Sequence, residues 1–85
     1  MNRAIISGKI NDIEYKLVDK GKIYALIIIK LEVEKCEKNI LIIGKNKLAD
    51  DIYRRYHIYD NIIINGYLKK TKDDVIIILK DIEKM

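Results

Sequence analysis

The chain of 85 residues has no proline, tryptophan or phenylalanine, only four glycines and a single cysteine. Without proline or Gly/Ser-rich stretches there is no recognisable linker, so we expect one domain over residues 1–85. One cysteine excludes an internal disulfide framework. The sequence has no run of 18 apolar residues, and its start lacks the pattern of a secretory signal. We therefore expect a cytoplasmic protein with no membrane association.

The charge balance is mildly basic. Lys and Arg number 17 against 13 Asp and Glu, a formal charge of +4, in a chain that is 49% hydrophobic. This composition is too apolar for a disordered chain. The positive excess favours a polyanionic partner through phosphate neutralisation, although many other soluble proteins carry a similar excess.

Alternating apolar and polar side chains predict five strands, at residues 3–17, 23–31, 40–44, 62–68 and 75–79. The second run is almost wholly apolar, and in it we assign Tyr24, Leu26 and Ile28 to the core. Its outer face is then apolar and holds Ile23, Ala25, Ile27 and Ile29.

Between the third and fourth strands the apolar period changes to that of a helix, at residues 46–56. The predicted core-facing stripe of this helix comprises Leu48, Ala49, Ile52, Tyr53 and Tyr56. Asn46 is a suitable N-cap. Two acid–base pairs stand four residues apart, Asp50 with Arg54 and Asp51 with Arg55.

The order of three strands, one helix and two strands predicts an all-β fold. Strands of this length leave aggregation-prone edges unless the sheet closes. We therefore expect a five-stranded Greek-key barrel with one α-helix between strands three and four, which is the OB-fold.

Four short segments add a resemblance that covers nearly the whole chain. They are Asn2 to Ile10 (Asn-x-Ala-x-Ile-x-Gly-Lys-Ile), Gly21-Lys22-Ile23-Tyr24-Ala25-Leu26, Ile42-Ile43-Gly44-Lys45 followed by Leu48-Ala49-Asp50, and Ile62-Ile63-Ile64-Asn65-Gly66-Tyr67-Leu68. In this order they resemble bacterial single-stranded-DNA-binding proteins, an OB-fold family. The resemblance implies a module that binds single-stranded DNA in replication, recombination or repair.

The chain departs from that family in its aromatic residues. The family stacks bases on Trp and Phe, and Ile43 stands here at the aromatic position of strand three. Stacking is worth ~1–3 kcal/mol per base, so binding should be weak unless tyrosines substitute. The chain also has no acidic tail, and in size it is similar to the primosomal replication protein PriB. We expect a minimal, tail-less relative.

The candidate nucleic-acid-binding residues are one tyrosine and six lysines. Tyr67 is the expected stacking residue, with Tyr15 and Tyr59 as alternatives. The lysines expected to contact phosphates are Lys22, Lys45, Lys47, Lys69, Lys70 and Lys72. Lysines at such positions are equally typical of an ordinary solvated surface.

The apolar outer positions predict self-association, since an extended exposed apolar patch usually marks an interface. In the resembled family first strands pair across a two-fold axis. We therefore expect a homodimer that uses Ile5 and Ser7, with a tetramer as the alternative.

Catalysis finds no support in the sequence. Cys36 and His57 are 21 positions apart with no orienting group, and no Cys/His cluster has the spacing of a zinc site. We expect no enzyme, no metal and no cofactor. Two functions remain: a single-stranded-DNA-binding module with little sequence specificity, or an OB-fold assembly module that binds nucleic acid weakly or not at all.

Overall fold

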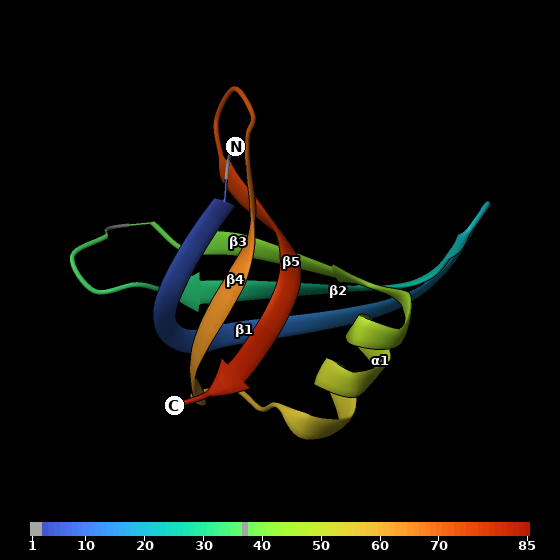
Figure 1. Cartoon of the computed structure of the whole chain (residues 1–85), viewed down its shortest axis with the longest axis horizontal. Helices are drawn as coiled ribbons and strands as arrows, with labels where there is room; N and C mark the ends of the chain where they lie inside the picture. The colour runs from blue at the N-terminus through green and yellow to red at the C-terminus, as the bar shows by residue number, and fades with distance from the viewer. Residues whose placement is uncertain (1–2, 37) are drawn as a thin grey trace.

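The computed structural model describes residues 3–36 and 38–85, so Asn2, the first residue of the motif quoted above, lies outside the described residues. The elements are β1 (Arg3–Lys20), β2 (Ile23–Glu32), β3 (Ile40–Lys45), α1 (Asn46–Arg55), β4 (Asn61–Lys70) and β5 (Val75–Lys84). Figure 1 shows the strands wrapped around a common core, with α1 beside β2 and β3. All five predicted strands and the predicted helix are present.

The sheet closes into a barrel with the strand order β1-β2-β3-β5-β4. β1 is long enough to pair with β4 through its first half and with β2 through its second half. Its pairing with β2 shifts register between Ile10 and Asp12, and at Gly8 an added Cβ would lie 2.5 Å from the Glu32 carbonyl oxygen. The barrel is closed by a parallel pairing of β3 with β5. The predicted five-stranded OB-fold barrel is confirmed.

Alternate residues of each strand fill the barrel with branched aliphatic side chains. The fully buried branched residues of the strands are Ile10, Ile27, Ile29, Leu31, Ile42, Ile62, Ile64 and Ile77, and Ala25 and the helix residues Ala49 and Ile52 complete this set. The alternation of β1 up to residue 10 turns Ala4, Ile6 and Ile10 inward, and that of β4 turns Ile62 and Ile64 inward, as the sequence pattern predicts.

On β2 the expected orientation is wrong. Ala25, Ile27 and Ile29 are buried, and the alternate residues Tyr24, Leu26 and Ile28 face outward. A continuous apolar run fits either orientation, so charged neighbours decide between them. Lys30 has the same parity as Ile28 and must reach solvent, which turns the whole set outward.

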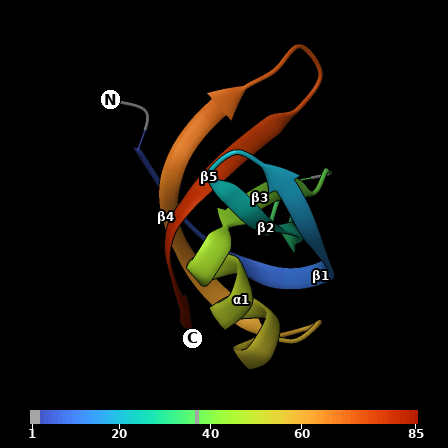
Figure 2. The same ribbon diagram turned by 90° about the vertical axis from the view of Figure 1, so that its right-hand side faces the viewer.

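The helix packs on β2 and β3 through Ala49 and Ile52, as expected. Tyr53, expected in the core, is 60% exposed because it lies at the edge of the apolar stripe. Figure 2 shows α1 and the β4–β5 hairpin at opposite ends of the molecule.

The start of the helix differs from the expectation. Lys45 occupies the N-cap position without a side-chain cap, and Asn46 is already the first helical residue. The Asn46 side chain instead accepts a hydrogen bond from the Tyr24 amide (2.8 Å) and donates one to the Lys22 carbonyl (3.1 Å). It therefore joins the helix start to the β1–β2 turn.

The predicted i,i+4 pairs of the helix are also replaced by other partners. Arg54 pairs with Asp51 at i,i+3, at 2.8 Å. Asp50 accepts hydrogen bonds from two tyrosines of β1 and β2. Its carboxylate is thus used between elements rather than along the helix.

β4 and β5 are both longer than expected. β4 continues through Lys69 and Lys70, which pair with Ile76 and Val75 and therefore belong to the strand rather than to the hairpin loop. The β4–β5 pairing shifts register between Asn65 and Gly66. At Gly66 an added Cβ would lie 2.4 Å from the Ile78 carbonyl oxygen, so only glycine fits this close crossing.

Candidate nucleic-acid interface

The outer face of β2, β3 and β5 carries an aliphatic patch. Ile28 pairs with Ile43, and Ile43 pairs with Ile78, so the three side chains form one outward row across the sheet. Neighbouring rows add further apolar residues. The aliphatic patch comprises six half-buried residues, Leu26, Ile28, Leu41, Ile43, Ile76 and Ile78.

Lysines border the aliphatic patch on two sides. One margin holds Lys30 and Lys69, whose strand partners belong to the patch. The opposite margin holds Lys16 and Lys45, which flank Leu26 in its row. All four are exposed, and Lys16 forms a 3.3 Å ion pair with Glu14, which pairs with Ile28 at the β1 end of the central row. The result is an apolar strip between two positive margins.

Tyr67 continues the central row at its β4 end. It pairs with Ile78 on one side and with Arg3 on the other, and it is 42% exposed. The Lys80 ammonium lies 3.5 Å from the Tyr67 hydroxyl and 5.8 Å from the ring centroid. The hydrogen bond and charge of Lys80, with a further contribution from Arg3, lower the pKa of Tyr67 below its usual value. This end of the face therefore combines an aromatic ring with two cations.

Lys22, Lys45 and Lys47 meet at the other end of the face. The Asn46 side chain bonds the β1–β2 turn to the helix start, so the backbone at Lys22 lies next to that at Lys45 and Lys47. All three side chains are exposed. Together they form a basic end beside β2 and β3.

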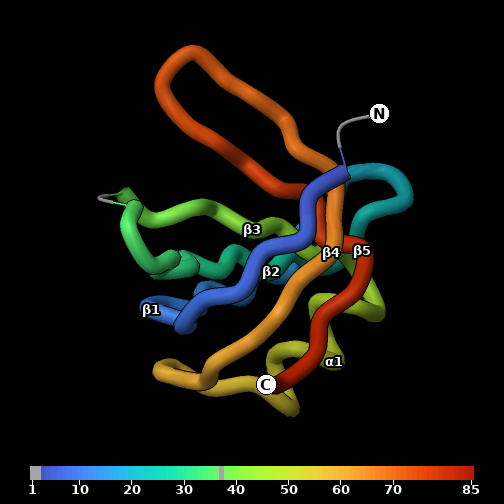
Figure 3. The backbone as a smooth tube through the Cα atoms, turned by 60° about the vertical axis from the view of Figure 1, so that its left-hand side comes forward, coloured from blue at the N-terminus to red at the C-terminus, as the bar shows by residue number. Residues whose placement is uncertain are grey.

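Lys70 and Lys72 lie on the β4–β5 hairpin, which projects well beyond the barrel (Figure 3). The tip is closed by Thr71, whose hydroxyl accepts a hydrogen bond from the Asp74 amide at 3.1 Å. Of the predicted residues, the structure thus gathers Lys45, Tyr67 and Lys69 on one face, and it places Lys70 and Lys72 on an arm that extends from it.

Sequence reasoning missed several residues of this face, namely Arg3, Lys16, Lys30, Lys80 and most of the aliphatic patch. Lys80 was missed because the fifth strand was expected to end at residue 79. The outward isoleucines were missed because the orientation of β2 was inverted. Lys30 is an even number of residues from Leu26 and Ile28 on β2, so its charge could have indicated both that these residues face outward and that a lysine borders them.

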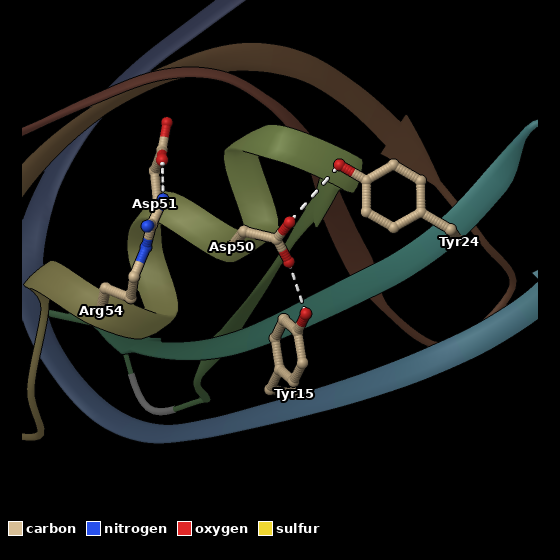
Figure 4. A network of polar contacts seen from close by, with 5 residues as sticks. All are labelled: Tyr15, Tyr24, Asp50, Asp51 and Arg54. Atoms are coloured by element: carbon tan, nitrogen blue, oxygen red, sulfur yellow. Dashed lines mark hydrogen bonds and ion pairs between the residues drawn. The ribbon is translucent and has the colours of Figure 1, made fainter.

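A second aromatic group lies between α1 and the β1–β2 hairpin (Figure 4). Tyr15 donates a hydrogen bond to Asp50, and Tyr24 donates one to the same carboxylate at 3.4 Å. The Tyr15 ring stacks on Tyr53 with centroids 4.6 Å apart. The bond to Asp50 raises the pKa of Tyr15, because ionisation of the phenol would break it. Tyr15 and Tyr24 thus hold the helix against the hairpin, and Tyr24 is 50% exposed rather than in the core.

The outer face of β1, β4 and the end of β5 has a different character. Ile5 is 68% exposed, and Ser7 and Ile63 lie beside it as exposed cross-strand partners. Asp81 and Glu83 border a shallow groove over this face. Here the exposed apolar residues are flanked by carboxylates, in contrast to the lysines around the aliphatic patch.

Cys36 and His57 are both exposed and lie in loops. Within residues 3–36 and 38–85, no three His, Cys, Asp or Glu side chains form a group that could hold a metal ion. In the same part of the chain, no helix is long and apolar enough to cross a membrane.

Comparison with known proteins finds similarity in structure alone. No family model and no curated protein matches the sequence. The barrel superposes on the SSB domain of a Synechococcus protein with a TM-score of 0.85, at 10% identity over 98% of this chain and 94% of that one. The chain has the OB-fold.

Two further solved structures agree with this assignment. The second single-stranded-DNA-binding protein of Mycobacterium smegmatis gives a TM-score of 0.81 at 11% identity, over 100% of this chain and 87% of that one. PriB of Ralstonia solanacearum gives a TM-score of 0.75 at 15% identity, over 100% of this chain and 99% of that one. The PriB match spans both chains almost end to end, so the barrel needs no added element to superpose on that protein.

Proposed function

We propose that this chain is a non-catalytic, single-domain module that binds single-stranded DNA with little sequence specificity, in cytoplasmic replication, recombination or repair. The observation that carries the proposal is the aliphatic patch between two lysine margins on β2, β3 and β5. In OB-folds this face and the loops beside it bind oligonucleotides. Solved structures of the same fold include proteins named for single-stranded-DNA binding.

The arrangement of charge and apolar surface suits a single strand. Exposed lysines of the margins neutralise phosphates and release counterions, which does not depend on sequence. Bases turned towards the sheet cover the aliphatic patch and stack on Tyr67. The patch offers no hydrogen-bonding side chain to read base edges, so sequence specificity is low.

We further propose a homodimer formed through the outer face of β1, with Ile5 and Ser7 at its centre and a tetramer as the alternative. An aliphatic side chain as exposed as Ile5 is stabilised by burial against a second copy. This surface is centred on β1, whereas the aliphatic patch lies on β2, β3 and β5, and the two surfaces adjoin at Arg3 and Tyr67.

A second candidate function is an assembly module that binds protein rather than DNA. The observation that favours it is the same exposed pair of Ile5 and Ile63 with its acidic border. In that case the aliphatic patch would also bind protein, and lysine substitutions around it would leave DNA affinity unchanged.

The test is a fluorescence-anisotropy titration of labelled oligo-dT at two salt concentrations, with the oligomeric state fixed by light scattering. Lys69→Ala/Lys70→Ala should weaken binding and reduce the salt slope by about 0.7 per lost phosphate contact. The matched control is Lys9→Ala/Lys84→Ala, which removes the same charge at the opposite end of the barrel. No binding by folded protein at 50 mM salt would refute DNA binding and leave the assembly function.

A further inference from the structure

We propose that the aliphatic patch prefers bases that carry a C5-methyl group, so that the protein selects thymine over uracil and thereby DNA over RNA. The inference rests on the proposed function and adds the chemical feature that the site recognises. It depends on the composition of the central row, where Ile28, Ile43 and Ile78 are adjacent cross-strand neighbours on three strands.

Aliphatic side chains distinguish bases by the apolar area that each base can cover. They have no donor or acceptor for base edges and no π-face for stacking. They do gain from covering apolar area, and thymine is the one standard DNA base with a methyl group, at C5. Between two pyrimidines that differ only at C5, a row of isoleucines therefore favours the methylated base.

The surroundings of the row fix how a strand meets it. Lys30 and Lys69 lie along one margin and Lys45 along the other, so phosphates are held at the margins and bases turn inward over the row. Adjacent strands are about 4.8 Å apart, so the span from β2 to β5 is about 10 Å and accommodates one or two bases. The charged margins also exclude a purely apolar partner, which would leave these lysines desolvated and unpaired.

The expected size of the preference follows from methyl burial. One fully covered methyl group corresponds to about a fourfold gain in affinity. One or two bases over the row therefore give about a 4- to 16-fold preference for oligo-dT over oligo-dU. The two oligonucleotides differ only in the C5-methyl group, and the measurement uses the unaltered protein.

The experiment compares oligo-dT with oligo-dU, and oligo-dC with its 5-methylcytosine counterpart, by anisotropy at one salt concentration. Both methylated strands should bind more tightly. Ile43→Thr, which keeps a β-branched side chain, should reduce both ratios towards one while oligo-dU affinity changes little. Ile58→Thr, at an exposed isoleucine in the turn between α1 and β4 that belongs to neither proposed surface, is the matched control and should retain the wild-type ratios.

Several outcomes would overturn the inference. Equal affinity for oligo-dT and oligo-dU would refute it while leaving DNA binding intact. If folded Ile43→Thr keeps the wild-type preference for oligo-dT over oligo-dU, the methyl group is not bound by the row, and the inference is refuted as well. A lower oligomer mass in Ile43→Thr without any change in the ratio would assign the patch to a second copy of the chain. Absence of binding to every oligonucleotide would refute the inference and the proposed function together.

Discussion

Replacing Ile43 by phenylalanine should increase affinity for single-stranded DNA. Ile43 is the centre of the outward row, between Ile28 and Ile78, and it is half-buried only by these neighbours. A phenylalanine ring at this position extends over the aliphatic patch instead of entering the core. The substitution therefore supplies a stacking platform without overpacking the barrel.

The magnitude follows from the value of one stacked base. Base–aromatic stacking is worth about 1–3 kcal/mol, or about 5- to 150-fold in affinity. The ring displaces aliphatic contacts that the bases already make, so we expect the low end, about tenfold. Because no phosphate contact changes, the slope of affinity against salt should stay the same.

The assay is the oligo-dT titration at two salt concentrations, with Ile58→Phe as the matched control. Ile58 is an exposed isoleucine in the turn between α1 and β4, outside both proposed surfaces, so it tests the effect of an added surface ring as such. A rise of equal size in both variants would indicate nonspecific stickiness. No rise in folded Ile43→Phe would show that bases do not lie on the aliphatic patch.

Three further predictions concern stability and pH. Asn46→Ala should lower the free energy of unfolding by about 2–3 kcal/mol, because three inter-element hydrogen bonds are lost and φ is +55° there. Asn46→Gly should lower it less, since glycine tolerates that φ. Gly66→Ala should lower the free energy of unfolding, measured by urea titration, by about 2–3 kcal/mol. Gly21→Ala should lower it by only about 1 kcal/mol, because its φ is positive but no atom lies near the added Cβ. Because the pKa of Tyr15 is raised in the folded state, its protonated phenol contributes stability below pH 10, and this stability is lost as the pH rises through the folded-state pKa. Tyr15→Phe should remove this contribution to the pH dependence in thermal unfolding scans.

The sequence predicted the barrel well because closure depends on the number, length and alternation of strands. On β1 and β4 the outward positions include polar residues such as Arg3, Ser7, Lys9 and Asn61, and these indicated the orientation of both strands correctly. β2 has seven consecutive apolar residues from Ile23 to Ile29, so local alternation could not orient it. The site on its outer face was therefore only partly predictable.

The expected burial of two tyrosines was wrong for a related reason. Tyr24 and Tyr53 lie on apolar patterns, yet each has a hydroxyl that a core would have to satisfy. In the structure both rings lie at the edge of the helix, where Tyr24 reaches Asp50 and Tyr53 covers Tyr15. Such partners come from elements 20 or more residues apart, and no local pattern specifies them.

The distribution of charge links the two proposed surfaces. Lysines surround the aliphatic patch on β2, β3 and β5, whereas Asp81 and Glu83 border the exposed Ile5 on the other side. These carboxylates repel phosphates, so a bound strand is confined to the lysine-rich face. A dimer formed through Ile5 would therefore leave both lysine-rich faces open. Substituting Ile5 should then dissociate the dimer while each barrel keeps its intrinsic affinity for a short oligonucleotide, and only long strands that span both barrels should bind more weakly.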